Sequence, residues 1–324
     1  MGRAGGGESL MQIVEGYRNV PPGARGAVLA IGNFDGVHRG HQALFAAAKN
    51  EGCALGAPAG ALIFEPHPRE FFHPEEPHFH LTPMPQKLAI FEKLGLDLAV
   101  ILPFNRELAS LSADDFIACV LVEGLGARHV VIGHDFFFGK GRSGTPETMR
   151  AAAQRLGFGV TVVAPVAEEG EVFSSSAIRL RLAQGDMKGG AAMLGRWWRI
   201  GGTVVRGAKR GVCLGFPTAN VPLPRGTALG HGIYAVRAYV TGRQYDGAAY
   251  IGTRPTYDDG MPVLEVFLFD FNGDLYGRAI EVEFIDFVRG DRKFASSGEL
   301  VAQMQVDCER AQEILAAAPA TPAD

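Results

Sequence analysis

Short apolar runs alternate with segments of helical periodicity in the first 185 residues. The run at residues 27–31 is apolar throughout, as expected of a buried strand, and residues 42–49 behind it are typical of a helix. The alternation continues with predicted strands at residues 62–64, 98–102, 129–132 and 160–163 and predicted helices at residues 86–94, 112–124 and 146–156. Strands that are apolar on both faces and alternate with helices predict a doubly wound parallel sheet, which binds ligands at the carboxyl ends of its strands.

After about residue 195 the pattern changes to strands that follow one another without long helices between them. Further strands are predicted at residues 202–205, 233–240, 263–269 and 280–287, with turns at Gly242, Gly247, Gly260 and residues 272–274. This order is typical of an antiparallel barrel or sandwich. A final helix is predicted from about residue 298 to 318, with an apolar stripe of Leu300, Met304, Cys308, Ala311 and Leu315. The fold class is therefore α/β plus β, and we expect two domains, residues 1–186 and 187–324.

The composition limits the classes of binding partner and the cellular compartments that we expect for this protein. A net charge of −4 gives no global field that would recruit nucleic acid or an anionic membrane. No apolar run approaches the roughly 20 residues that span a bilayer, and the first seven residues do not resemble a secretory signal. The four cysteines form no Cys-x-x-Cys pair, which favours free, mostly buried thiols in a reducing compartment. We expect a cytoplasmic protein without nucleic-acid or membrane partners.

The richest candidate chemistry lies between the first predicted strand and helix. Gly32, Asn33, Phe34 and Asp35 form a glycine-containing turn, and His38 and His41 follow at the start of the helix. Unpaired N–H groups and the helix dipole make such a junction an anion site. Because the two histidines are three residues apart, they lie on one face of the first turn. There they suit a polyphosphate better than a metal, since imidazoles can donate hydrogen bonds to charge on a transferring phosphoryl group.

Three other segments of the first half carry candidate binding residues. They contain Pro66 and His67 after the second predicted strand, Asp135 in a glycine-rich loop, and Ser175, Ser176 and Arg179 at a helix start. The loop formally contains a Gly-x-Gly-x-x-Gly fingerprint, but its first glycine lies well past the end of its strand, so we discount dinucleotide binding. The patch of His67, His73, His78 and His80 suggests zinc, but the intervening prolines disfavour a compact shared site, and we expect no structural metal.

In the second half, Thr218 and Asn220 offer hard oxygen ligands suited to Mg²⁺ carried on ATP. Lys209 belongs to a basic, glycine-containing loop, residues 206–211, that is fit to cover phosphates. Glu265 lies inside an otherwise apolar strand, where a carboxylate needs a partner or a chemical role.

The string from Gly32 to His41 contains the His-x-Gly-His signature of nucleotidylyltransferases. It resembles, more narrowly, the bacterial bifunctional riboflavin kinase/FMN adenylyltransferases, also called FAD synthetases. The resemblance implies an N-terminal FMN adenylyltransferase domain in which His38 and His41 stabilise the transition state. By the same resemblance Ser175, Ser176 and Arg179 hold phosphates, Pro66 and His67 lie beside the flavin, and Asp135 faces the adenosine.

The second half is similar to the riboflavin kinases through Gly-Phe-Pro-Thr-Ala-Asn at residues 215–220 and Leu-Glu-Val at residues 264–266. The similarity implies an antiparallel barrel in which Glu265 is the general base and Arg289 lies near the flavin. Val212, Tyr250 and Phe267 depart from the family pattern, and so does Asp291.

These departures leave three hypotheses for the activity. A bifunctional enzyme would use ATP with Mg²⁺ to make FMN from riboflavin and then FAD from FMN. The second hypothesis is FAD synthesis alone, with a degenerate flavin-binding kinase domain. The third, a non-catalytic flavin or nucleotide sensor, would need the reactive residues to be lost, yet all of them are present. The sequence leaves a weak homo-oligomer open.

Overall fold

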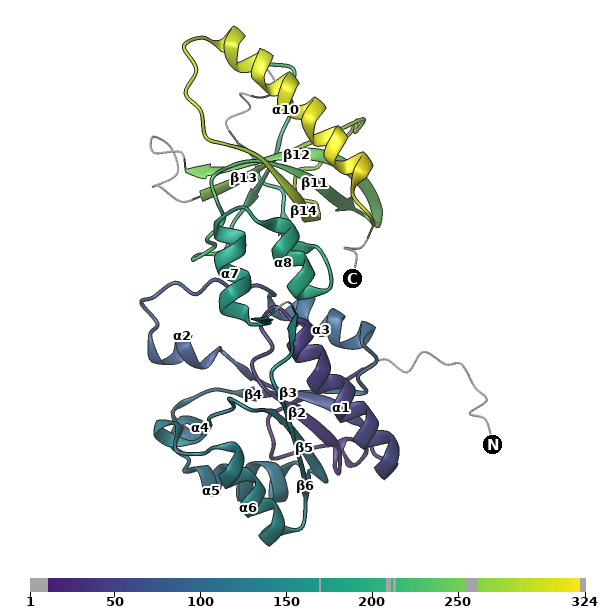
Figure 1. Ribbon diagram of the computed structural model, residues 1–324, viewed down its shortest axis with the longest axis vertical. Helices are drawn as coiled ribbons and strands as arrows, with labels where there is room; N and C mark the ends of the chain where they lie inside the picture. Colours follow the sequence, from purple (N-terminus) through teal and green to yellow (C-terminus); the bar gives the residue numbers. More distant parts are fainter. Residues whose placement is uncertain (1–10, 169, 208–210, 212–213, 254–261, 321–324) are drawn as a thin grey trace, which may run out of the picture. The chain divides into compact units, whose positions relative to one another are not determined.

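The computed structural model describes residues 11–168, 170–207, 211, 214–253 and 262–320. The chain divides into two compact units. The N-terminal unit comprises residues 1–77 and 83–173, and the C-terminal unit comprises residues 78–82 and 174–324 (Figure 1). Contacts thus group residues 174–186 with the C-terminal unit, and the boundary expected between residues 186 and 187 stays a prediction.

The N-terminal unit is built on a six-stranded sheet in the order β1-β4-β3-β2-β5-β6. All of its strand pairs are parallel, as predicted. The strands are β1 (Gln12–Glu15), β2 (Val28–Ile31), β3 (Ala59–Glu65), β4 (Leu98–Pro103), β5 (His129–Gly133) and β6 (Gly159–Val163). Strand β3 pairs with one side of β2, and β5, which comes later in the chain, pairs with the other side of β2. The topological switch point, where such sheets bind ligands, therefore lies beside the carboxyl end of β2.

Helices flank this sheet, and a small hairpin ends the unit. The helices are α1 (Arg39–Leu55), α2 (Pro68–Phe72), α3 (Met84–Lys93), α4 (Arg106–Ser110), α5 (Ala113–Asp115) and α6 (Pro146–Leu156), with 3-10 turns η1 (Pro22–Ala24) and η3 (Lys140–Arg142). The hairpin consists of β7 (Ala167–Glu168) and β8 (Glu171–Val172). Two apolar clusters of buried side chains form the cores of this unit.

The C-terminal unit carries a six-stranded sheet in the order β10-β13-β12-β11-β14-β9, and its pairs are all antiparallel. The strands are β9 (Trp198–Thr203), β10 (Ala219–Pro222), β11 (Gly232–Val240), β12 (Arg243–Thr253), β13 (Pro262–Leu268) and β14 (Ala279–Gly290). An isolated bridge between Val205 and Asn220 joins the segment after β9 to β10, so the two edges of the sheet meet. The predicted barrel is confirmed.

Helices α7 (Ser175–Ala183), α8 (Met187–Leu194) and the terminal α10 (Ser297–Ala317) also belong to this unit. Helix α10 lies across the sheet (Figure 1) and buries Ala311 and Leu315 against Ala235 and Ala248. Its last turn is held by Arg237, whose guanidinium donates to the carbonyls of Leu315, Ala318 and Pro319.

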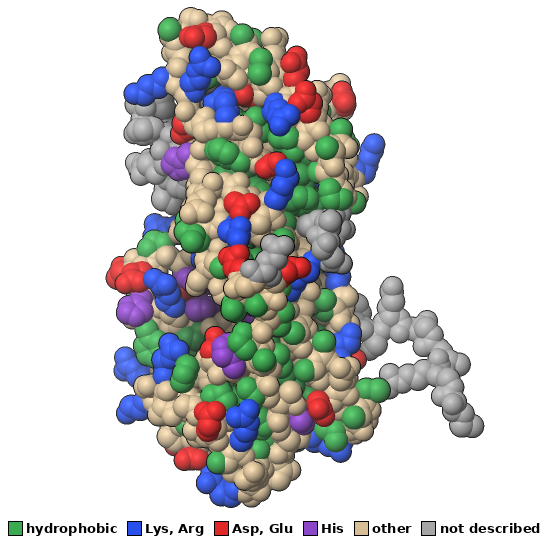
Figure 2. All heavy atoms as spheres, viewed as in Figure 1, with side chains coloured by type: hydrophobic (Ala, Val, Ile, Leu, Met, Phe, Trp, Pro, Cys, Tyr) green, Lys and Arg blue, Asp and Glu red, His purple; other side chains and the backbone are tan. Residues whose placement is uncertain are grey.

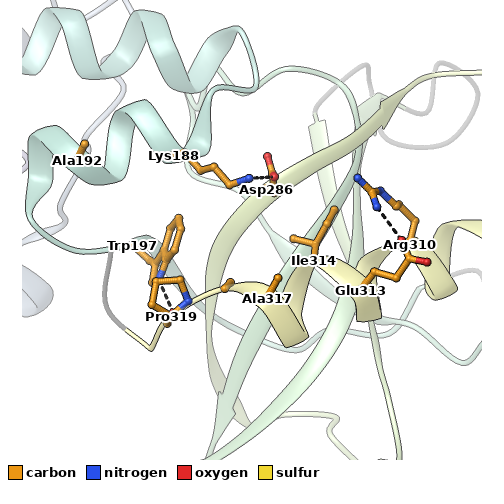
Figure 3. Close-up of a pocket in the computed structure, with 10 residues that line it drawn as sticks. Lys188, Ala192, Trp197, Asp286, Arg310, Glu313, Ile314, Ala317 and Pro319 are labelled. Carbon is orange, nitrogen blue, oxygen red and sulfur yellow. Dashed lines mark hydrogen bonds and ion pairs between the residues drawn. The ribbon is translucent and has the colours of Figure 1, made fainter. Parts of the chain in front are cut away.

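A groove of about 440 Å³ lies between α8, β14 and the end of α10. Trp197 and Ile314 are among its apolar lining residues (Figure 3). Its charged lining residues form ion pairs with one another, namely Lys188 with Asp286 and Arg310 with Glu313.

Several expectations were wrong in detail. Gly247, expected in a turn, lies in the middle of β12, where a Cβ would come within 2.4 Å of the Phe267 carbonyl. The helix predicted at residues 112–124 is present, but residues 116–124 of it form a π-helix. Cys53 and Cys119 are exposed rather than buried, and both are free thiols.

Two further observations concern the hydropathy of the helices and the distribution of surface charge. Within the described residues, no helix combines the length and the apolar character needed to cross a membrane. Basic and acidic side chains are interspersed over the described part of the face in Figure 2.

Candidate active sites

The histidine pair at the start of α1 is assembled as the sequence predicts. His38 is the N-cap residue, and its Nδ1 accepts a hydrogen bond from the His41 backbone N–H at 3.4 Å. The two imidazole rings stack with centroids 3.6 Å apart and an interplanar angle of 24°. His38 is 6% exposed, so its imidazole lies in an environment that strengthens hydrogen bonds to charge.

The turn that precedes the histidines adopts an unusual backbone conformation. Phe34 and Val37 have φ angles of +49° and +45°, although bulky and β-branched residues rarely adopt positive φ. Such a conformation persists only where its surroundings over-determine it. The buried Phe34 ring packs edge-on against Phe45, and it also meets the edge of His41 with centroids 5.1 Å apart. Gly32 permits this arrangement, because a Cβ there would approach the Phe34 ring to 3.0 Å.

A buried lysine that was not among the predicted site residues contacts this turn. Lys87 of α3 is 5% exposed, and its Nζ donates to the Asn33 carbonyl at 2.9 Å. Burial lowers the pKa of Lys87, while the negative charges of Asp35, Glu65 and Glu70 partly offset that effect. Helical spacing could have indicated that Lys87 is buried, since it lies one turn before the fully buried Phe91 on the same face of α3. Asp35 is also buried, with 3% of its surface exposed.

Asn33 contributes a buried acceptor to the same turn. Its Oδ1 is buried and accepts no hydrogen bond from the described residues. A buried polar atom in that state is explained most simply by a ligand or water.

The loops after the two strands next to β2 carry the other predicted residues of this unit. After β3, Pro66 precedes His67, which caps the short helix α2 by accepting from the Arg69 N–H at 3.1 Å. After β5, the side chain of Asp135 is 79% exposed and lies 3.9 Å from the His134 imidazole. These loops and the histidine turn therefore follow three adjacent strands and lie at the same edge of the sheet.

The predicted phosphate residues of helix α7 belong to the C-terminal unit. Ser174 is the N-cap residue, with its hydroxyl accepting from the Ala177 N–H at 3.1 Å, so Ser175 and Ser176 open the helix as expected. Arg179 lies one turn further on and donates through Nε to the Phe79 carbonyl at 2.7 Å. Its Nη2 lies 3.3 Å from His78 Nε2.

The predicted kinase residues meet in one register row across the antiparallel sheet. Asn220 pairs with Glu265, Glu265 pairs with Tyr250, and Tyr250 continues through Ile233 to Arg289. Directly paired residues share a face of a sheet. With about 4.8 Å between strands, the row spans about 19 Å.

At one end of that row three polar groups are in position to act together. The Thr218 hydroxyl donates to Glu265 Oε2 at 3.2 Å, and Asn220 is the strand neighbour of Glu265. The backbone of Gly207 passes over Asn220 so closely that a Cβ there would lie 2.5 Å from Asn220 Nδ2. Gly207, at the start of the basic loop, therefore lies at this end of the row, and Lys209 and Val212 lie outside the described residues.

At the other end of the row Arg289 is fixed by a residue that the sequence analysis did not single out. Its Nε and Nη2 donate to the two oxygens of Asp307 at 2.8 and 2.6 Å, and Asp307 is 4% exposed. Gln303 donates to the same carboxylate at 3.0 Å. Helix α10 thus orients the arginine with a bidentate pair.

Two of the departures from the family pattern, Tyr250 and Phe267, lie in the described part of the sheet without separating Thr218 from Glu265. Tyr250 folds back along β12, where a Cβ on Gly252 would lie 2.0 Å from its hydroxyl. Phe267 packs edge-on against Phe216, with ring centroids 5.3 Å apart.

Comparisons with known proteins agree with the two units. Residues 21–177 match the family described as FAD synthetase, and residues 194–315 match the family described as riboflavin kinase. The expected boundary at residue 186 falls in the interval between these two matches.

Relatives that span nearly the whole chain carry both activities in their names. A bifunctional riboflavin kinase/FMN adenylyltransferase of Pseudomonas fluorescens is 41% identical over 94% of this chain and 98% of its own. One from Bacillus subtilis (strain 168) is 38% identical over 88% of this chain and 91% of its own. A crystal structure described as a macrolide-efflux protein from Streptococcus pneumoniae is also similar, with a TM-score of 0.82 and 28% identity over 95% of this chain and 99% of that one. The chain therefore belongs to the family of bifunctional riboflavin kinase/FMN adenylyltransferases.

Proposed function

We propose that this chain phosphorylates riboflavin to FMN at the Thr218, Asn220 and Glu265 cluster and adenylylates FMN to FAD at the His38 and His41 turn. The observation that carries the proposal is the assembly of the kinase cluster, in which the hydroxyl of Thr218 contacts Glu265 and strand register brings in Asn220. A degenerate kinase domain, the alternative hypothesis, would not be expected to keep these three groups together.

In the kinase step, Glu265 takes the proton of the riboflavin 5′-hydroxyl. The hydroxyl oxygen then bonds to the γ-phosphorus of ATP as the bond to ADP breaks. The Thr218 hydroxyl and the Asn220 amide oxygen are hard donors that fit Mg²⁺. When bound, that ion would neutralise phosphate charge. We assign the flavin end of the site to Arg289 and the phosphate cover to Lys209.

In the adenylyl step, an FMN phosphate oxygen bonds to the α-phosphorus of ATP as the bond to pyrophosphate breaks. His38 and His41 donate hydrogen bonds to the charge that develops, so the protein acts by positioning and electrostatics. Gly32, Asn33, Phe34 and Asp35 shape the turn, and the unsatisfied Asn33 Oδ1 supports a ligand there. Roles for Pro66 and His67 at the flavin, Asp135 at the adenosine, and Ser175, Ser176 and Arg179 at the phosphates stay predictions. A cytoplasmic location, where ATP is available, is part of the same proposal.

One incubation separates the hypotheses. The chain is mixed with ATP and Mg²⁺ and either riboflavin or FMN, and the flavins are separated by chromatography. The proposal expects FMN and then FAD from riboflavin, and FAD from FMN. FAD from FMN alone would instead support the degenerate kinase, and no product from either substrate would support a sensor. Replacing Mg²⁺ with Mn²⁺ or Ca²⁺ tests the choice of ion.

A further inference from the structure

Lys87 is a charge buried where a neutral side chain would be less costly. Within the described part of the chain it is the one lysine among the buried residues, at 5% exposure. Its hydrogen bond to the Asn33 carbonyl, at 2.9 Å, joins α3 to the turn after β2 across 54 positions of sequence. Burying an ammonium costs free energy of folding unless the group is paired and hydrogen-bonded. A functional role for Lys87 would explain why a charged side chain stands at this position.

The charges around Lys87 come from three other elements. Asp35 lies in the turn and is 3% exposed, Glu65 ends β3, and Glu70 lies in α2. All three carboxylates act on the lysine electrostatically. The ammonium therefore supplies positive charge that offsets Asp35 at the carboxyl end of β2, beside the proposed site for a polyphosphate.

The hydrogen bond also acts on the strained part of the turn. The Asn33 carbonyl belongs to the peptide that leads directly into Phe34, which has a φ of +49°. The Phe34 ring in turn lies against His41 with centroids 5.1 Å apart. Fixing the Asn33 carbonyl thus fixes the peptide plane, the Phe34 ring and one side of the histidine pair.

We infer that Lys87 is a positioning residue for adenylyl transfer, which holds the Asn33 carbonyl and balances Asp35 so that His38 and His41 are set for the transition state. The inference rests on the proposed function of the histidine turn. It assigns to Lys87 no contact with substrate.

The test compares Lys87→Met with Lys49→Met in the full chain. Lys49 is a matched control, because it is exposed on α1 in the same unit and likewise donates to a carbonyl, that of Leu94, at 2.7 Å. We expect Lys87→Met to lower kcat for FAD formation from FMN by about 10²-fold, the effect of a small misplacement of catalytic groups, with a smaller change in the KM for ATP. Lys49→Met should stay within about twofold, as surface changes usually do. Riboflavin phosphorylation should be unchanged in both.

The outcomes are distinguishable. The inference would be overturned if Lys87→Met had the same kcat as Lys49→Met. It would also be overturned if Lys87→Met had a lower melting temperature but full turnover per folded molecule. A wild-type chain that makes no FAD would instead overturn the proposed function.

A pH profile gives a second measurement that does not depend on how Lys87→Met folds. Because burial lowers the Lys87 pKa, the wild-type adenylylation rate should fall at a pH below the range in which an exposed lysine titrates. Lys87→Arg should move that fall to higher pH, since a guanidinium stays charged. The same alkaline fall in both proteins would count against the role of the charge.

Discussion

At the scale of single residues, the hydroxyl of Thr218 donates to Glu265. In the proposed function the same hydroxyl would also bind the metal carried with ATP. Valine has nearly the same shape as threonine and lacks the hydroxyl. We predict that Thr218→Val slows riboflavin phosphorylation by about 10²-fold, the upper range for lost outer-shell and ligand groups of a metal site. The Mg²⁺ concentration for half-maximal rate should also rise, and adenylylation of FMN should be unaffected.

A threonine elsewhere in the same unit provides the control. Thr227 donates its hydroxyl to the Pro224 carbonyl at 2.7 Å in an exposed turn. Thr227→Val should keep the wild-type rate and Mg²⁺ dependence in a titration of both variants. An unchanged Mg²⁺ dependence in Thr218→Val would remove this residue from the metal site.

Residue-level chemistry was predictable where it was local. The histidine pair is set by a spacing of three residues and the capped start of one helix, and the structure confirms the contact. Lys87 and Asp307 escaped prediction because their partners, Asn33 and Arg289, lie 54 and 18 positions away. Helical spacing places Lys87 on the same face as the buried Phe91, but spacing does not show which groups from other elements meet the cost of burying the charge.

At the scale of elements, α10 packs on the sheet and, through Asp307, orients Arg289 at one end of the row. We predict that Asp307→Asn weakens the hold on Arg289 and raises the KM for riboflavin about tenfold, with a smaller change in kcat. The free energy of unfolding should fall by about 1.5–3 kcal/mol, the contribution of a hydrogen bond to a charged group. Steady-state kinetics and chemical denaturation measure the two effects.

The same helix offers a matched control. Glu313 pairs with Arg310 on the exposed side of α10 at 2.7 Å. Exposed pairs contribute little, so Glu313→Gln should leave both KM and stability near wild type. If Asp307→Asn changed stability without changing KM, α10 would have only a structural role.

Elements were predictable where their ends carry local signals. Helix α6 has the predicted bounds, Pro146–Leu156, because Thr145 caps it, Pro146 opens it and Gly157 ends it in the left-handed conformation. Strand β12 was missed because its sequence contains Gly247 and Gly252 and lacks a regular alternation. It is held by pairing with β11 and β13 on both sides, which is a non-local effect.

At the scale of the whole molecule, the change of pattern near residue 195 predicted two architectures, and the two sheets confirm them. The sequence did not predict that residues 78–82 group with the C-terminal unit. Part of that grouping rests on single contacts between distant positions, such as the donation from Trp198 Nε1 to the Leu81 carbonyl at 2.9 Å.

If one chain holds two chemically independent sites, a variant in each site should lose one reaction and keep the other. Comparing two such variants in both reactions is the most direct test. His41→Ala and Glu265→Gln are each assayed with riboflavin and with FMN, as full chains whose folding is checked by thermal melting. We predict that His41→Ala loses about 10²–10³-fold in FAD formation from FMN and retains riboflavin phosphorylation. Glu265→Gln should lose about 10²–10⁴-fold in FMN formation and still make FAD from supplied FMN. Either variant losing both steps while remaining folded would contradict two independent sites.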